Sequence, residues 1–386
     1  MNFQKRTTPQ GTKDLVFGEC RLIREVAAGI TEAFESRGYS EIMTPGLEYM
    51  DVFDGPNSYI KPKSMFKLFD REGNILVMRP DCTVPAARLA GSKLKSAKKP
   101  LRLFYNQPIY AQNRKLTGVF DEEIQVGAEL VGIPGEKADL EILSLAILAL
   151  SRLGVETTLE LGFSGFFDIL CYDLKLDERQ RSELLNIIGE KDFEKLDAFL
   201  NGFKGKAANA MRELPRLFGG EEILEKARKA LEGTTAFRML AYFEQLVADV
   251  KKLKRGGIII DLGLVQKNRY YTGLIFKGYI GGAPDAILSG GRYDNLYSEF
   301  GMDYPAVGFA LNLLMAAETL IKQGRMTKDS PADCMVFANE GYYAEGLLLV
   351  NELTSKGKKA IFSVFETLEE TEKFANQNGI EKVYEV

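Results

Sequence analysis

Apolar residues near the start of the chain recur every three or four positions, which predicts a helix over residues 19–37. A short strand is expected over residues 39–45. Residues 65–79 hold two strand-like runs around the turn sequence DREGN. Residues 81–90 then predict a helix, for which Asp81 is a suitable N-cap. Helical and extended segments therefore alternate along this part of the chain.

A long hairpin and a buried helix are expected next. Residues 101–111 and 123–131 have strand character and flank a polar loop. Residues 138–154 are apolar all round, which is typical of a helix that is buried. Residues 306–321 predict a strand that runs into a helix.

The secondary-structure pattern changes in the middle of the chain and again near its end. Residues 173–254 lose the strand pattern and predict a charged helical insertion. Three strands follow at 256–265, 270–280 and 285–291, and the short turns between them favour antiparallel pairing, because parallel strands need long crossovers. Residues 331–386 alternate strands and helices and predict a small α/β C-terminal unit. The pattern predicts an α+β fold with an antiparallel sheet flanked by helices.

Composition narrows the class of protein. Apolar residues make up 45% and charged residues 27% of the 386, with a net charge of −4, which is the balance of a globular protein without a nucleic-acid-binding charge. No apolar run is long enough for a membrane span, and the N-terminal residues lack a signal-peptide core. The four cysteines are scattered, which favours reduced thiols, no metal site and a cytoplasmic location.

The chain contains no histidine. Nucleophile systems that depend on imidazole, zinc sites of the H-E-x-x-H type and imidazole acid–base catalysis are therefore excluded.

Six spaced segments carry a specific resemblance. Together they are similar to the catalytic domain of histidyl-tRNA synthetase, a class II aminoacyl-tRNA synthetase, over about residues 5–325. The domain expected from the resemblance is 1–325, with the helical insertion inside it and 331–386 as a separate unit. In order, the segments are TPQGTKD (8–14), MRPDCT (78–83), EEIQVGAELVG (122–132), NRYYTGLIFKGY (268–279), LSGGRYDNL (288–296) and PAVGFAL (305–311).

The departures from that family concern ATP. Its motif 2 begins with an arginine that holds the α-phosphate and a glutamate two residues later; the matching positions are Ala111 and Asn113. A motif 3 arginine matches Met315, and a further arginine before the tyrosine pair matches Gln266. Fixed guanidinium groups stabilise charge that develops in amino-acid activation, and losing one such contact costs on the order of 3 kcal/mol. The resemblance therefore implies that activation is lost, unless nearby cations compensate.

The amino-acid pocket of that family is better preserved. Carboxylate, phenol and amide groups suit the imidazole and the α-ammonium group of histidine. The substrate carboxylate would normally meet the arginine that is now Gln266. The positions that match the family's histidine-binding residues are Asp81, Thr83, Gln125, Glu129, Tyr270, Tyr271 and Tyr293.

This combination is similar to the regulatory subunits of ATP phosphoribosyltransferase. The resemblance implies a non-catalytic subunit without cofactors that permits feedback inhibition by histidine in the first step of histidine biosynthesis. Its expected partner is the short-form catalytic subunit, in a hetero-oligomer with a homodimer core, and tRNA binding is not expected. The alternatives are a divergent active histidyl-tRNA synthetase and a scaffold or RNA-binding relative without a ligand.

Overall fold

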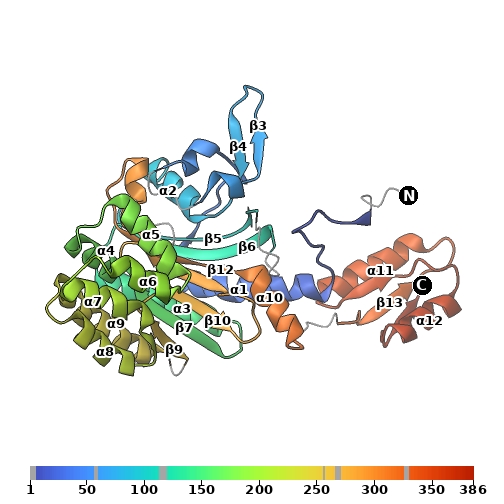
Figure 1. The fold of residues 1–386 in the computed structure, drawn as a ribbon. Coiled ribbons are helices and arrows are strands. Elements are labelled where there is room, and N and C mark those ends of the chain that lie inside the picture. The colour runs from blue at the N-terminus through green and yellow to red at the C-terminus, as the bar shows by residue number, and fades with distance from the viewer. Residues whose placement is uncertain (1–5, 56–59, 113–119, 255–256, 266–270, 326–329) are drawn as a thin grey trace. The chain divides into compact units, whose positions relative to one another are not determined.

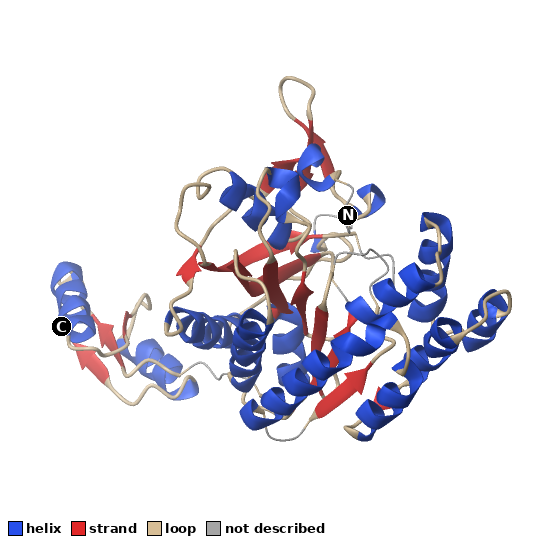
Figure 2. Ribbon diagram, turned by 90° about the vertical axis from the view of Figure 1, so that its left-hand side faces the viewer, coloured by secondary structure: helices blue, strands red, loops and turns tan. Residues whose placement is uncertain are grey.

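The computed structural model describes residues 6–55, 60–112, 120–254, 257–265, 271–325 and 330–386. The chain divides into two compact units, residues 1–326 and 327–386. The larger unit has strands at its centre and helices outside them (Figure 2). Its described residues hold a large mixed sheet and a small antiparallel sheet.

Nine strands form the large sheet of the described residues. Its longer strands, among them β5, β6, β12, β10 and β7, are labelled in Figure 1. Neighbouring strands in its middle pair antiparallel, as the sequence predicts for the hairpin β5–β6 and for the pair β10–β11. In spatial order the strands are β1 (Ser40–Glu41), β5 (Leu101–Tyr110), β6 (Glu122–Val131), β12 (Ala306–Asn312), β11 (Leu288–Arg292), β10 (Leu274–Ile280), β7 (Thr157–Phe163), β9 (Ile258–Asp261) and β8 (Phe218–Gly219).

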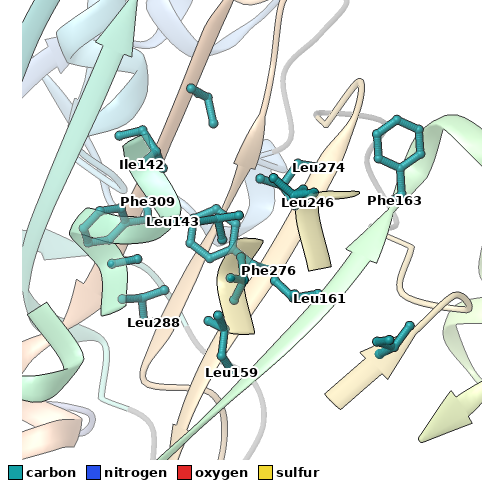
Figure 3. Close-up of a cluster of buried hydrophobic side chains, with 14 of the residues drawn as sticks. Ile142, Leu143, Leu159, Leu161, Phe163, Leu246, Leu274, Phe276, Leu288 and Phe309 are labelled. Carbon is teal, nitrogen blue, oxygen red and sulfur yellow. The ribbon is translucent and has the colours of Figure 1, made fainter. Parts of the chain in front are cut away.

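Helices cover one face of this sheet. They are α1 (Gly18–Glu35), α3 (Glu136–Ser151) and α10 (Leu313–Lys322), and α9 (Leu240–Leu253) packs against α3. Side chains of α3 and α9 meet those of four strands in one apolar cluster (Figure 3). The apolar helix expected at 138–154 is therefore buried, and burying a leucine or phenylalanine side chain there stabilises the fold by about 1.5–3 kcal/mol.

The predicted pairing of residues 256–265 was wrong. β9 does not pair with β10; β7, which the sequence pattern did not reveal, lies between them and pairs parallel to β9 and antiparallel to β10. The physical reason is the long connection from β7 to β9, which provides the crossover that parallel strands require. We call this connection the crossover region, residues 164–254. Its elements are α4 (Ser164–Asp173), α5 (Glu178–Gly189), α6 (Phe193–Leu200), α7 (Lys206–Glu213), β8, α8 (Glu222–Leu231) and α9.

The opposite face of the large sheet lies near a smaller layer. β2 (Leu47–Tyr49), β4 (Ile75–Met78) and β3 (Lys67–Phe69) form an antiparallel sheet, and α2 (Thr83–Gly91) follows it. The N-cap position of α2 is Cys82 rather than the predicted Asp81, although the Asp81 Oδ1 atom accepts a hydrogen bond from the Val84 amide at 3.3 Å. Asp81 thus caps the Val84 amide of α2 from the residue that precedes the N-cap position.

The smaller unit is a three-stranded parallel sheet with a helix after each of its first two strands. Separate apolar clusters join each helix to the sheet, one around Met335 and Ala375 and the other around Val336 and Leu353. This is the βαβ arrangement that the sequence predicts for residues 331–386. The elements are β13 (Cys334–Phe337), α11 (Tyr343–Ser355), β14 (Ala360–Phe362), α12 (Leu368–Gln377) and β15 (Val383–Glu385).

Candidate functional site

The candidate site lies on the sheet face that α1 and α3 leave uncovered. Successive side chains of a strand point to opposite faces, so that Gln125, Gly127 and Glu129 of β6 share one face. Their neighbours Val126, Ala128 and Leu130 enter the core below the helices. Because side chains alternate between the two faces, β6 buries apolar residues on one face and carries polar residues on the other.

Glu129 is the centre of the site, and it is 1% exposed. Its Oε1 atom accepts a hydrogen bond from the Tyr105 hydroxyl at 3.1 Å, and its Oε2 atom accepts one from the Tyr293 hydroxyl. Tyr105 comes from β5, and Tyr293 follows β11. Three strands therefore bring one carboxyl group and two phenols together.

Asp81, Thr83 and Gln125 lie beside this group. The Thr83 hydroxyl is 3.3 Å from the Tyr105 hydroxyl, and the Gln125 Oε1 atom accepts a hydrogen bond from the Cys82 amide at 3.1 Å. Asp81 is 5% exposed, and its Oδ2 atom is buried without a hydrogen-bond partner among the described residues. Buried polar atoms normally have partners, so an orphaned carboxylate oxygen is a site at which a donor from a ligand would be favourable.

Glycines allow the two phenols and Glu129 to approach the sheet. A Cβ atom on Gly308 would lie 2.6 Å from the Tyr293 hydroxyl, and one on Gly127 would lie 2.7 Å from the Tyr105 hydroxyl. Both distances are too short for non-bonded atoms, so only glycine fits. Glycine within a strand often marks such a close approach.

Burial changes the acidity of both carboxyl groups. It raises the pKa of Glu129 to about 8, against hydrogen bonds from Thr83 and Tyr105 that favour the ionised form, and nearby Asp81 raises it further. It also raises the pKa of Asp81 to about 7. None of the described arginines or lysines forms an ion pair with either group. A cation supplied by a ligand would therefore relieve an unfavourable burial of charge.

The aromatic residues complete the described part of the site. Tyr271 is 9% exposed, and its ring centroid is 6.4 Å from that of Tyr293. Tyr293 stacks in turn on Tyr297 at 6.4 Å. Tyr270 and Gln266 lie outside the described residues. The structure thus brings together the other six predicted histidine-binding positions from β6, the start of α2 and the segments beside β10 and β11.

The positions that match the lost ATP arginines carry small or apolar side chains. Ala111 follows β5, and its amide donates to the Asp121 carbonyl at 2.8 Å. Met315 is buried in the first turn of α10, and its amide donates to the Asn312 Oδ1 atom at 2.9 Å. The third arginine position, Gln266, and Asn113, which matches the motif 2 glutamate, lie outside the described residues.

A carboxyl group occupies the same region. Glu123 of β6 bonds to the Asn312 side chain, and burial raises the pKa of Glu123 to about 7, with a further contribution from Asp121. A carboxyl group repels the phosphates of a nucleotide, whereas a guanidinium group binds them. The described side chains here do not suit a triphosphate.

Tyr105 and Arg292 belong to the site but were not singled out from the sequence. Tyr105 is fully buried and holds Glu129, and Arg292 ties the strand before Tyr293 to Asp139 through hydrogen bonds of 2.6 and 2.9 Å. The isolated Gly127 in an apolar strand was a usable signal for a large neighbour. Nothing local in the sequence predicts the long-range pair Arg292–Asp139.

The raised pKa values predict an unusual pH dependence of folding. A carboxyl group with a folded pKa above its unfolded value stabilises the fold below the unfolded pKa, and this contribution is lost as pH rises toward the folded value. For Asp81, Glu123 and Glu129 the window runs from about pH 4 to about pH 8. We therefore expect the free energy of unfolding to fall by several kcal/mol between pH 5 and pH 8, at about 1.4 kcal/mol per pKa unit.

Urea unfolding at a series of pH values measures this dependence. The chain has no histidine, so imidazole titration does not obscure this window. The double variant D81N/E129Q should flatten the profile, leaving mainly the contribution of Glu123. A free energy of unfolding that rises from pH 5 to pH 8 would contradict the assignment.

Two kinds of feature are absent from the described part of the chain. No helix there combines the length and apolar character required to cross a membrane. No group of three or more cysteine, aspartate or glutamate side chains there could hold a metal ion.

Comparisons with known proteins show the family to which the chain belongs. The family model described as histidyl-tRNA synthetase matches residues 11–315. The ATP phosphoribosyltransferase regulatory subunit of Clostridium acetobutylicum is 37% identical, over 98% of this chain and 95% of its own length. That of Bacillus mycoides is 36% identical, over 99% and 92% respectively.

Solved structures show the same fold. An ATP phosphoribosyltransferase regulatory subunit/histidyl-tRNA synthetase from Bacillus halodurans C has a TM-score of 0.85 at 29% identity and covers 98% of both chains. Histidyl-tRNA synthetase from Nostoc sp. PCC 7120 has a TM-score of 0.78 at 20% identity, covers 98% of this chain and 90% of its own, and bears on the fold alone. The chain therefore belongs to the ATP phosphoribosyltransferase regulatory subunit family, a paralogous branch of the histidyl-tRNA synthetases with the class II synthetase fold.

Proposed function

We propose that this chain is a non-catalytic regulatory subunit of ATP phosphoribosyltransferase, and that its synthetase-type pocket binds free histidine as an effector. The partner is the short-form catalytic subunit, in a cytoplasmic hetero-oligomer with a homodimer core. The observation that carries the proposal is the contrast between two neighbouring sites on one sheet. The amino-acid site keeps Asp81 and Glu129, while the described ATP-site positions have Ala111 and Met315.

The chemistry of the kept residues supports histidine as the ligand. Two buried carboxyl groups without a described cation favour a ligand with more than one donor or positive charge. Histidine offers an α-ammonium group and two imidazole nitrogens. A carboxylate and a phenol can bind the imidazole, while another carboxylate and the Gln125 amide can bind the ammonium group.

Histidine regulates only if it binds two states of the assembly unequally. A ligand with equal affinity for both states shifts nothing. The proposal therefore requires that histidine favours an assembly in which the catalytic subunit is less active.

A mixing experiment tests the proposed function. We expect phosphoribosyltransferase activity to appear only when this chain is added to the short catalytic subunit, and to fall when histidine is added. A catalytic subunit that is fully active alone, and unaffected by this chain, would contradict the proposal.

Two further measurements separate the alternatives. Histidine-dependent ATP–pyrophosphate exchange by the purified chain would establish an active synthetase, which we do not expect. Binding of free histidine by an untagged chain excludes a scaffold without a ligand. Proton NMR spectroscopy measures this binding directly. Because the chain has no histidine, its spectrum contains no imidazole signals of the protein that could overlap those of the ligand.

A further inference from the structure

The helices of the crossover region reach the proposed histidine pocket through two separate sets of hydrogen bonds. The first set begins at Ser164, the first residue of α4, which is 8% exposed. Its hydroxyl lies 3.1 Å from the Tyr271 carbonyl and 3.0 Å from the Gly273 carbonyl, and its amide donates to the Gly273 carbonyl at 2.8 Å. The start of α4 thereby holds the backbone on either side of Thr272, including that of Tyr271.

The second set begins at Tyr242 on α9. Its hydroxyl donates to the Asp139 Oδ2 atom. The Asp139 Oδ1 atom accepts two bonds from Arg292, from Nε at 2.9 Å and from Nη2 at 2.6 Å. Arg292 directly precedes Tyr293, which binds Glu129. Between Tyr242 of the crossover region and the Glu129 carboxyl group, the connection thus passes through Asp139, Arg292 and Tyr293.

The two sets are tied to each other. The Thr272 amide donates to the Arg292 carbonyl at 2.7 Å, and the Asp294 amide donates to the Thr272 hydroxyl at 3.1 Å. Arg292 also donates to the Asp294 Oδ1 atom at 3.0 Å. Residues 271–273 and 292–294 therefore form one hydrogen-bonded unit that carries both Tyr271 and Tyr293.

Burial makes this network sensitive to displacement. Asp139 is 1% exposed and Arg292 is 7% exposed. Hydrogen bonds between buried charged groups are strong, and leaving a buried charge without its partner is costly. A movement of α9 relative to α3 therefore cannot leave Asp139, Arg292 and the tyrosine segments unchanged.

We propose that Ser164 and Tyr242 are positioning residues for the ligand-binding tyrosines, and that they couple occupancy of the pocket to the state of the crossover region. The coupling rests on the proposed function for the identity of the ligand. This coupling gives the crossover region, in which the sequence offers no motif, a role in transmitting the histidine signal. The crossover helices order when the pocket is occupied and loosen when it is empty.

The variant Tyr242→Phe tests the coupling because it removes only the hydroxyl. The ring keeps its packing against Phe163, at 5.7 Å between centroids. Tyr279→Phe is the matched control, since the Tyr279 hydroxyl also donates to a buried carboxylate, Glu160, at 2.7 Å, but it lies near the end of β10 that is far from Tyr271. Hydrogen–deuterium exchange of both variants and the natural chain, with and without histidine, provides the readout.

We call β5, β6 and β11 the pocket strands, because they bring Tyr105, Glu129 and Tyr293 together. In the natural chain and in Tyr279→Phe, we expect histidine to slow exchange in α9 and in the pocket strands. In Tyr242→Phe the slowing in α9 should disappear, and the histidine affinity should fall about three- to tenfold. Equal behaviour of the two variants would overturn the coupling. Slowing confined to the pocket strands of the natural chain would overturn it as well.

Failure of the proposed function gives a different result. If the natural chain does not bind histidine, the ligand assignment is wrong, and exchange without ligand still tests the coupling. Residues 271–273 and 288–294 should then exchange faster in Tyr242→Phe than in Tyr279→Phe, and the absence of this difference would overturn the coupling. If Tyr242→Phe does not fold, Ser164→Ala should produce the same loosening at residues 271–273, and unchanged exchange there would overturn it.

Discussion

Glu129→Gln is expected to weaken histidine binding by about 30- to 100-fold while leaving the chain folded. The natural carboxyl group faces two phenols, and no ion pair with a described cation compensates it, so that a cationic ligand gains strongly from the ionised form. Glutamine keeps an acceptor oxygen for Tyr105 and nearly the same volume, but it offers no charge. Losing a charged hydrogen-bond partner costs about 2–3 kcal/mol, which corresponds to the stated change in affinity. Calorimetric titration of histidine at pH 8 measures it.

Glu123→Gln is the matched control for this variant. Glu123 lies on the same strand, and burial also raises its pKa, but its side chain bonds to Asn312 beside the former ATP positions. We expect the control to bind histidine as the natural chain does. Glu129→Gln should also be at least as stable to urea at pH 8, because it removes the cost of a buried charge. Unchanged histidine affinity in Glu129→Gln would show that the ligand lies elsewhere.

Asp139→Ala is expected to lower the free energy of unfolding by about 3 kcal/mol. Asp139 is buried between Arg292 and Tyr242, and removal of one partner from a buried ion pair typically costs about 3–5 kcal/mol. The lower end applies because Arg292 retains Asp294, at 3.0 Å, and the Gly135 carbonyl. For a unit of this size the melting temperature should fall by roughly 5 °C.

The exposed pair Glu225–Lys229 on α8 is the control for Asp139→Ala. Both side chains are about three-quarters exposed, and such pairs contribute little. Glu225→Ala should not measurably change the melting temperature. An equally small effect of Asp139→Ala would mean that the Arg292–Asp139 pair does not hold the pocket strands.

The helices and the central hairpin could be predicted because their signals are local. The spacing of apolar residues in α1 and the unbroken apolar run in α3 depend only on nearby positions. β7 escaped prediction, and β9 was given the wrong neighbour. Strand pairing joins residues far apart in the sequence: Leu161 pairs with Ile260 only because the whole crossover region returns the chain to that edge.

The candidate site also has a part that the sequence predicts and a part that depends on contacts between distant residues. Residue types in family motifs predicted Asp81, Gln125 and Glu129 as pocket positions, and the composition alone excluded catalysis by imidazole side chains. The sequence also determined that the ATP arginines are absent at Ala111 and Met315, because absence of a charge is a property of the residue and needs no geometry.

Only the tertiary structure decided how those residues act together. It placed Tyr105 and Tyr293 on the two oxygens of Glu129, left one oxygen of Asp81 without a described partner, and joined Arg292 to Asp139 across 153 positions of sequence. The physical reason is that acidity and hydrogen bonding depend on burial and on neighbours from other strands. A carboxylate in a sequence has its ordinary pKa, and the fold around Glu129 raises it to about 8.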